Sequence, residues 1–241
     1  MEIIPDRQQF VSFRFFKLDP VWRRLSESER TRGKAEFREA IESYKDRLIL
    51  NAYSLMGMRA DADFFIWRIG YHLEEFEEMS ARAANAGVGK YLNVAYSYLS
   101  MTRRSIYVDQ HSHEGQEGDR LHIVPGLCKY AFIYPFIKTR EWYRLDKKTR
   151  QEAMTEHIAF GHKYPSVKIN TTYSYGLDDQ EFVLAFESDE PKDFLDLVMD
   201  LRESKASAYT LKDTPTFTGI RHSLADLLDL LDKPALSKVN A

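Results

Sequence analysis

Two kinds of hydrophobic pattern follow one another along the chain, and they do so in the same order twice. Runs of aromatic and β-branched residues indicate strands, and apolar residues three or four positions apart indicate helices. The predicted strands are 10–16, 48–58, 64–69 and 94–100, then 130–137, 167–175, 182–186 and 215–220. The predicted helices are 26–45 and 73–86, then 147–164 and 192–204, followed by a short apolar helix at 224–231. The order β-α-β-β-α-β is that of a ferredoxin-like unit. The pattern therefore predicts an α+β fold in which two such repeats form a dimeric α+β barrel.

The two halves also match residue by residue. At an offset of 120 residues the register pairs Phe16 with Phe136, Trp22 with Trp142 and Tyr53 with Tyr173 without a gap. After an adjustment of two residues, Phe64 meets Phe182. The duplication predicts an N-terminal repeat at 1–108, a linker loop at 109–126 and a C-terminal repeat at 127–241. The linker is long and polar, and loops of that length are often functional.

Composition and charge mainly exclude certain classes of function. Lys and Arg total 34 against 37 for Asp and Glu, and this net charge of −3 gives no basic surface for nucleic acid. Cys128 is the single cysteine, which excludes an internal disulfide and a multi-thiolate metal site. No run approaches the about 20 apolar residues of a membrane helix, and the first residues lack the pattern of a signal peptide. We therefore expect a cytoplasmic protein that binds neither nucleic acid nor membrane.

His157 is the first candidate for chemistry, because the repeat comparison pairs it with Phe37. Both positions are predicted to face the barrel from the first helix of their repeat. A site that is apolar in one repeat and imidazole in the other suggests that only the second half acquired a function, and a neutral imidazole suits a haem iron. The alternative is a core histidine whose hydrogen bonds are satisfied. His162 lies about 140° further around the helix, so the two do not bind one metal together.

Two further candidates lie at the start of the linker. His111 and His113 could bind a metal loosely, although a solvated pair is the simpler interpretation. Tyr107 lies where a strand enters the linker, beside Arg103 and Arg104. A tyrosine there can carry redox or proton chemistry, and it can equally be a rim or interface residue.

The second half of the chain carries a resemblance to a known family. Its segments are EHIAFGHKYPSVKINT at 156–171, GLDDQEF at 176–182, YPF at 134–136, EWY at 141–143, and Arg202 with Ser207. These segments resemble the chlorite dismutase and coproheme decarboxylase superfamily, and most closely the coproheme decarboxylases of the actinobacterial type. The resemblance extends over nearly the whole chain and is looser in the first half.

The resemblance implies a role for several residues. His157 occupies the position of the proximal haem ligand. Tyr107 matches the tyrosine that becomes a radical and attacks the propionates, and His111 matches the distal base that handles protons. Arg202 and Ser207 match residues that hold porphyrin carboxylates. Actinobacterial members more often have phenylalanine where this chain has Tyr107, so two other tyrosines are alternatives for the radical, Tyr98 and Tyr134.

Ile169 distinguishes between the two chemistries of the superfamily. It occupies the distal position where chlorite dismutases carry an arginine, and chlorite decomposition needs a cation to hold the oxyanion. Lys168 does not replace it, because neighbouring residues on a strand point to opposite faces. The resemblance therefore implies oxidative decarboxylation of iron coproporphyrin III to haem b by hydrogen peroxide, in a homopentamer. The alternatives are a chlorite dismutase and a haem-binding protein without turnover.

Overall fold

The computed structural model describes residues 1–107 and 121–233, and it contains the predicted order of elements twice. The first repeat consists of β1 (Phe10–Leu18), α1 (Glu27–Glu42), β2 (Ile49–Ser54), β3 (Phe64–Gly70), α2 (Leu73–Asn85) and β4 (Leu92–Met101). The second consists of β5 (Tyr130–Lys138), α4 (Lys147–His162), β6 (Lys168–Tyr173), β7 (Phe182–Ser188), α5 (Pro191–Glu203) and β9 (Phe217–His222). Shorter elements lie between or after them: α3 (Arg140–Arg144), β8 (Thr210–Lys212), α6 (Leu224–Leu230), and the 3₁₀ helices η1 (Pro20–Arg24), η2 (Gly87–Tyr91) and η3 (Lys205–Tyr209).

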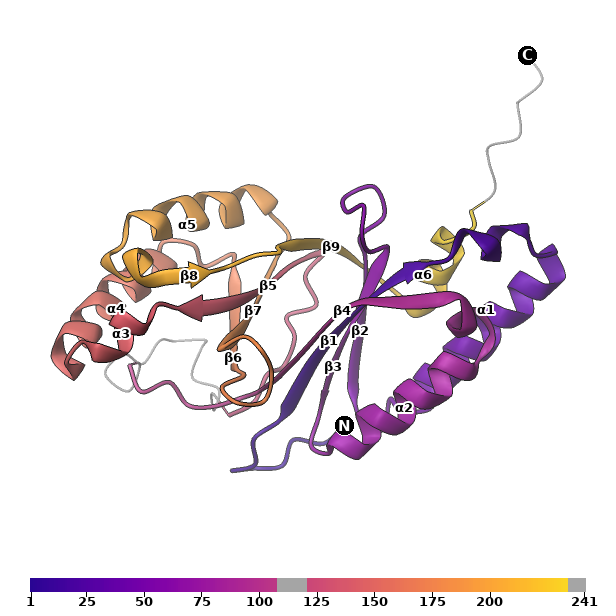
Figure 1. Ribbon diagram of the computed structural model, residues 1–241, viewed down its shortest axis with the longest axis horizontal. Coiled ribbons are helices and arrows are strands. Elements are labelled where there is room, and N and C mark those ends of the chain that lie inside the picture. The colour runs from indigo at the N-terminus through magenta and orange to yellow at the C-terminus, as the bar shows by residue number, and fades with distance from the viewer. Residues whose placement is uncertain (108–120, 234–241) are drawn as a thin grey trace, which may run out of the picture.

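The strands of both repeats join into one closed sheet. Their order is β7-β6-β4-β1-β3-β2-β9-β5, and β5 pairs with β7 to close the ring, while β8 extends β5 at its end. The helices of the first repeat lie on one side of the strands and those of the second repeat on the other (Figure 1). This closure confirms the predicted α+β barrel of two ferredoxin-like repeats, and it leaves each repeat with an outward sheet face covered by its own helices.

Side-chain alternation along the strands separates the barrel interior from these outward faces. In β1, Val11, Phe13 and Phe15 point into the barrel and are fully buried. The interior also joins the two repeats, because the rings of Phe15 and Phe217 lie 4.0 Å apart between centroids. The barrel is therefore a packed aromatic core, and any site for a large ligand must lie on an outward face.

The first helix of each repeat begins at a side-chain cap. Ser26 accepts a hydrogen bond from the Glu29 amide, and the Glu29 carboxylate accepts one from the Ser26 amide, which together form a capping box. Asp146 caps α4 by accepting a hydrogen bond from the Thr149 amide at 2.9 Å. These caps set the start of α1 and α4 at equivalent positions of the two repeats.

The alternation also corrects one detail of the repeat alignment. Tyr53 lies in the barrel interior, whereas Thr172 is the interior residue of β6 and its neighbour Tyr173 points outward. Tyr53 and Tyr173 are therefore not equivalent, although the sequence register pairs them. The offset of 120 residues falls by one before β6 and by one more between β6 and β7, and a change of one residue in a strand exchanges its two faces.

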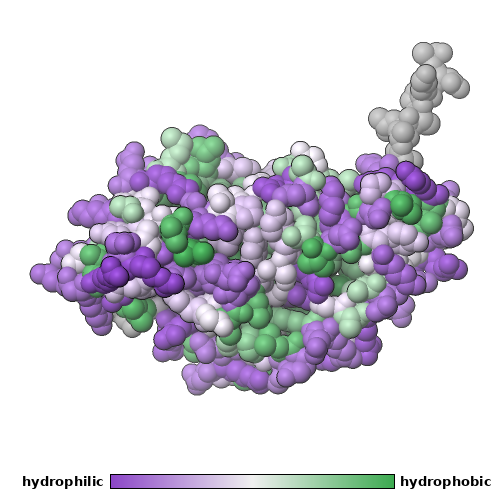
Figure 2. Space-filling model, in the orientation of Figure 1, coloured by the Kyte–Doolittle hydropathy of each residue, from purple (hydrophilic) through white to green (hydrophobic). Residues whose placement is uncertain are grey.

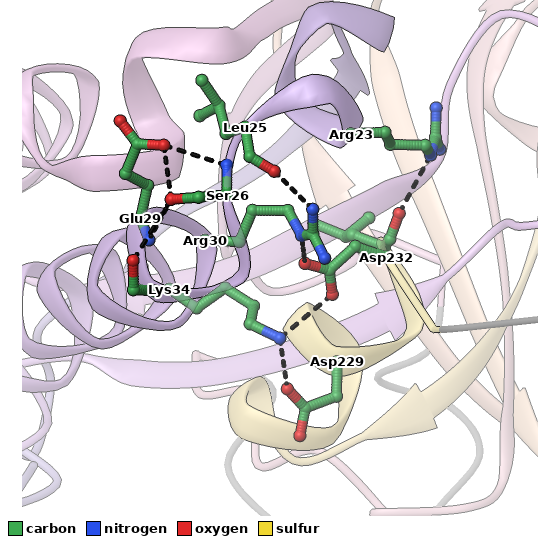
Figure 3. A network of polar contacts seen from close by, with 10 residues as sticks. Arg23, Leu25, Ser26, Glu29, Arg30, Lys34, Asp229 and Asp232 are labelled. Carbon is green, nitrogen blue, oxygen red and sulfur yellow. Dashed lines mark hydrogen bonds and ion pairs between the residues drawn. The ribbon is translucent and has the colours of Figure 1, made fainter.

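The C-terminal helix α6 docks on the first repeat, as its apolar sequence suggests (Figure 3). Arg30 of α1 donates a hydrogen bond to Asp232 at 2.9 Å, and Lys34 forms ion pairs with Asp229 at 2.7 Å and Asp232 at 3.0 Å. Leu227 and Leu228 are buried in the core beneath these ion pairs. The C-terminal end of the second repeat therefore packs against the helices of the first repeat.

The predicted domain boundaries fall partly outside the described residues. Of the linker, residues 121–126 are seen, and the Ile123 amide donates to the Gln9 side chain at 2.6 Å. Within the described part of the chain, no helix is long and apolar enough to cross a membrane. Apolar side chains are exposed over α5 (Figure 2), where Leu195 and Met199 are 56% and 62% exposed.

Candidate functional site

His157 lies near the middle of α4 and is half-buried against the second repeat. Its Nδ1 atom is buried and has no hydrogen-bond partner among the described residues, in contrast to the satisfied core histidine of the alternative interpretation. Burial, and secondly the charge of Lys138, lower the pKa of the imidazole to about 4. The ring is therefore neutral at pH 7, and a neutral imidazole is the form that binds a metal ion.

Lys138 is the last residue of β5, and its charge acts on His157. It is 8% exposed, and its ammonium group donates to the Ala206 carbonyl at 2.7 Å and lies 4.7 Å from the Trp142 ring centroid. Burial lowers the pKa of Lys138 to about 8, against the opposing effect of Glu181. Sequence reasoning missed this residue, and the signal available was a lysine inside a strand otherwise rich in aromatic residues.

Ser207 lies in η3, the 3₁₀ helix that packs beside α4. The Lys205 amide donates to the Glu156 carboxylate at 2.8 Å, which fixes η3 next to the turn of α4 that carries His157. Glu156 is thus held by the backbone of η3 and is not a partner of the imidazole. The structure brings Ser207 and His157 to the same end of the second repeat through this contact.

Gly161 lies one turn beyond His157 in α4, and it adds no side chain to the surface of the helix there. A β-carbon built on Gly161 would lie 3.6 Å from Cδ1 of Ile169, so α4 and β6 face each other here across glycine and isoleucine. Ile169 is 42% exposed, although it lies on the strand face that α4 overlies. Gly161 and Ile169 therefore provide an apolar surface one helical turn from His157.

The three candidate tyrosines lie in three different environments. Tyr98 is buried in the barrel interior. Tyr107 packs on Trp142 at 6.3 Å between ring centroids, and its carbonyl accepts a hydrogen bond from Gln151 of α4. Tyr134 lies on the outward face of β5 and stacks on Phe186. Burial and the charge of Asp213 raise the pKa of Tyr134, so its hydroxyl stays protonated.

Two arginines lie on the helices around this face. Arg202 of α5 forms an ion pair with Asp213, and both charges influence the ionisation of Tyr134. Arg150 of α4 lies two turns before His157, and its buried Nε atom has no hydrogen-bond partner in the part of the chain that the structure describes. Sequence reasoning missed Arg150 as a site residue, although the spacing of seven residues from His157 would place both on one helix face.

The remaining predicted site residues, His111 and His113, lie outside the described residues. Among residues 1–107 and 121–233, no group of three or more His, Cys, Asp and Glu side chains could hold a metal ion. A porphyrin iron needs a single protein ligand, and a neutral histidine nitrogen is chemically suited to that position. The unpartnered imidazole nitrogen and the apolar surface around Ile169 fit that group.

Comparisons with known proteins find relatives that match most of this chain. A family model described as chlorite dismutase matches residues 30–222. A coproheme decarboxylase from Mycolicibacterium smegmatis is 31% identical over 185 residues, which cover 76% of this chain and 78% of that protein. A chlorite dismutase from Ideonella dechloratans is 24% identical over 228 residues, or 92% of this chain and 79% of that protein.

Solved structures show the same fold. A mutant chlorite dismutase from Candidatus Nitrospira defluvii superimposes with a TM-score of 0.86 at 23% identity, covering 95% of this chain and 97% of that one. A novel heme-binding protein from Thermus thermophilus superimposes with a TM-score of 0.83 at 22% identity, over 95% and 99% of the two chains. The matched family model spans both repeats, and the chain belongs to the chlorite dismutase family.

Proposed function

We propose that this protein is a decarboxylase of iron coproporphyrin III that uses hydrogen peroxide and produces haem b. The proposal is supported by the relative named coproheme decarboxylase and by the apolar residue Ile169 on the strand face below α4. Each of two propionates would lose CO2 and become a vinyl group. One propionate, one peroxide molecule and one proton give one vinyl group, one CO2 and two water molecules, so the two electrons removed from the substrate reduce the peroxide.

His157 would hold the iron of the porphyrin. Its pKa of about 4 keeps the ring neutral across the physiological range, so no proton competes for the nitrogen. The ammonium group of Lys138 opposes protonation of the same ring. When bound, the iron supplies the redox chemistry with peroxide, and the protein supplies the ligand and the shape of the pocket.

The choice of iron coproporphyrin III over chlorite as the substrate rests on Ile169. An isoleucine cannot hold an oxyanion such as chlorite by charge, and a lost contact of this kind costs about 3–4 kcal/mol of transition-state stabilisation. The apolar side chain is compatible with uncharged hydrogen peroxide. Oxygen release from chlorite, followed with an oxygen electrode, is therefore expected to be absent or very slow. Vigorous oxygen release would favour the chlorite dismutase alternative.

Hydrogen-atom transfer from the propionate requires a tyrosine at the pocket. Tyr107 is the residue implied by the family register, and His111 would deprotonate the peroxide because imidazole titrates near neutral pH. The geometry supports Tyr134 as the alternative, since it faces outward from β5 near Arg202, whereas Tyr98 points into the barrel. A phenol with a raised pKa gives up its proton and electron together more readily than its proton alone.

Charged and polar groups at the edges would hold the propionates. Arg202 and Ser207 are the predicted pair, and Arg150 adds a buried Nε donor that has no partner among residues 1–107 and 121–233. Charge-assisted hydrogen bonds between guanidinium and carboxylate are stronger than neutral ones. When a propionate binds, Arg202 would either release Asp213 or donate hydrogen bonds to Asp213 and the propionate at the same time.

The assembly would be a homopentamer, as the family resemblance implies. Leu195 and Met199 of α5 and Leu211 of β8 expose apolar side chains that a subunit contact would cover. Light scattering would then give five times the chain mass of 28.2 kDa. A mass of one chain would contradict this part of the proposal.

The deciding experiment adds iron coproporphyrin III to the purified protein and titrates hydrogen peroxide while product masses are followed. We expect a three-propionate intermediate and then haem b, each with release of CO2. Binding of the porphyrin without any change in mass would contradict the proposal and favour a haem-binding protein without turnover.

A further inference from the structure

The first repeat contains a small cavity on its own outward sheet face, between the strands and helices α1 and α2. Its volume is about 40 Å³, and its polar lining consists of Arg14, Arg68 and Ser80, with apolar side chains and glycine around them. None of the described residues that line it carries a carboxylate. Two cationic side chains therefore share a largely apolar cavity that holds no acidic group.

Arg68 is the more deeply buried of the two, with 5% of its surface exposed. Its terminal nitrogens donate to Ser80 Oγ at 2.7 Å and to Ser12 Oγ at 2.6 Å, both neutral acceptors. Its Nε atom is buried and has no hydrogen-bond partner among the residues that the structure describes. Burial and the neighbouring charge of Arg14 lower the pKa of Arg68 to about 9, so the guanidinium is shifted toward neutrality but still charged at pH 7.

Arg14 lies diagonally opposite Arg68 on the adjacent strand, because Ser12 pairs with Arg68 and Arg14 pairs with Ile66. Its guanidinium lies 5.8 Å from the Phe16 ring centroid, and its buried Nε atom likewise has no hydrogen-bond partner within residues 1–107 and 121–233. In the described part of the chain, neither arginine forms an ion pair with a carboxylate. Buried charges are normally paired, because an uncompensated charge costs several kcal/mol.

We propose that this cavity binds a small monovalent anion, held between the guanidinium groups of Arg14 and Arg68. Since a single water molecule needs about 10–15 Å³ of such space, the cavity admits an anion of a few atoms and excludes a porphyrin. The planar fork of a guanidinium matches a planar oxyanion, so formate and nitrate are the best-matched probes. The anion would supply the missing counter-charge and the acceptors for both unpartnered Nε atoms.

The location strengthens the inference. Arg14 and Tyr134 occupy equivalent positions on the first strands of the two repeats, and Arg68 corresponds to Phe186 on the third strands. The cavity is thus the counterpart, in the first repeat, of the face that carries the candidate site in the second. Phe37 and Ile41 of α1 close the space on the helix side. The proposal does not depend on the function assigned to the second repeat.

The test is thermal unfolding of the full-length protein in sodium formate or sodium nitrate, compared with sodium gluconate at equal ionic strength. Gluconate is too large for the cavity, so it controls for general salt effects. We expect a saturable rise of the melting temperature of about 3–5 °C at ten times Kd. Arg14→Gln should abolish this rise, while Arg38→Gln, an exposed position on α1, should retain it.

Only the part of the response that depends on Arg14 is assigned to the cavity, so an anion bound to a porphyrin iron does not count. In gluconate, Arg14→Gln should melt no lower than the parent, since it removes a like charge beside Arg68. Should Arg14→Gln fail to fold, calorimetric titration of Arg14→Lys replaces it, with an expected loss of affinity of at least fivefold. Equal responses to formate and gluconate, or an unchanged response in the Arg14 variants, would overturn the proposal.

Discussion

The two repeats have the same order of strands and helices but fill the space below their first helix in opposite ways. In the first repeat, Phe37 and Ile41 of α1 are 1% and 3% exposed and belong to one continuous core. In the second repeat, His157 and Gly161 occupy the equivalent positions, 120 residues later. The second repeat thus has an imidazole in place of the Phe37 ring, and a glycine in place of the branched side chain of Ile41.

A second difference lies in the arginines of these helices. Arg30 of α1 donates hydrogen bonds to Asp232 and to the Leu25 carbonyl, whereas the buried Nε of the equivalent Arg150 of α4 has no partner among the described residues. The two repeats therefore use the equivalent face of their first helix differently. Apart from the small cavity beside Arg14 and Arg68, the first repeat fills its helix face with core side chains, whereas the second places an imidazole and a glycine there.

The largest effect is expected from removal of the phenol that serves the reaction. Tyr107→Phe and Tyr134→Phe each lose one hydroxyl and should bind iron coproporphyrin III as the parent does. The variant that lacks the reacting phenol should form no product, because phenylalanine cannot give up a hydrogen atom. Mass spectrometry after peroxide addition identifies it. Parental rates of haem b formation in both variants would contradict a role for either tyrosine.

Truncation of the two equivalent helix residues should affect stability very differently. Phe37→Ala should lower the free energy of unfolding by about 3–5 kcal/mol, because it empties a packed core. His157→Ala, measured without porphyrin, should lower it by about 1 kcal/mol or less, because the imidazole makes no hydrogen bond through Nδ1. Urea denaturation measures both. Equal losses would show that α4 is packed as tightly as α1.

Gly161→Ile would give α4 the residue that closes the first repeat. We expect at least a tenfold loss of porphyrin affinity, because the branched side chain occupies the space beside Ile169. The matched control is Gly161→Ala, whose β-carbon would lie at an ordinary contact distance of 3.6 Å from Ile169 and should bind normally. Absorption titration with haem compares them. Unchanged affinity in the isoleucine variant would place the ligand elsewhere.

The smallest effect concerns pH. The pKa of His157 is about 4 in the folded chain and about 6.5 when unfolded, so between these values the unfolded chain binds a proton that the folded chain does not. The contribution of His157 is therefore fully present above pH 6.5 and is lost as the pH falls toward 4. Melting temperatures of porphyrin-free His157→Phe should fall less steeply over this range than those of the parent. Parallel curves would contradict the low pKa.

Much of the fold was predictable because it rests on local patterns. The capping sequence at Ser26 and the apolar alternation of the strands each act within a few residues, and both repeats form as expected. The pairing of His157 with Phe37 was also available from the duplication. In contrast, the face on which Tyr173 lies depends on a one-residue shift before β6, which pattern alone does not resolve.

The rest of the site depends on contacts between distant segments. Lys138 influences His157 across the gap between β5 and α4, and Arg14 meets Arg68 only through the register of β1 and β3. Neither contact has a sequence signature, because a lysine or arginine in a strand is more often solvated. The short elements α3, β8 and η3 were missed for the same reason: they are fixed by packing against α4 and β5.

The central claim is that His157 alone among the residues of the two repeats binds the iron. The most direct test is the electron paramagnetic resonance and resonance Raman signature of the ferric porphyrin complex in the parent, in His157→Ala, and in His157→Ala with added imidazole. We predict histidine ligation in the parent, its loss in the variant and its return with imidazole. A variant that kept the histidine signature without imidazole would contradict the account, and it would direct attention to His162 as the ligand.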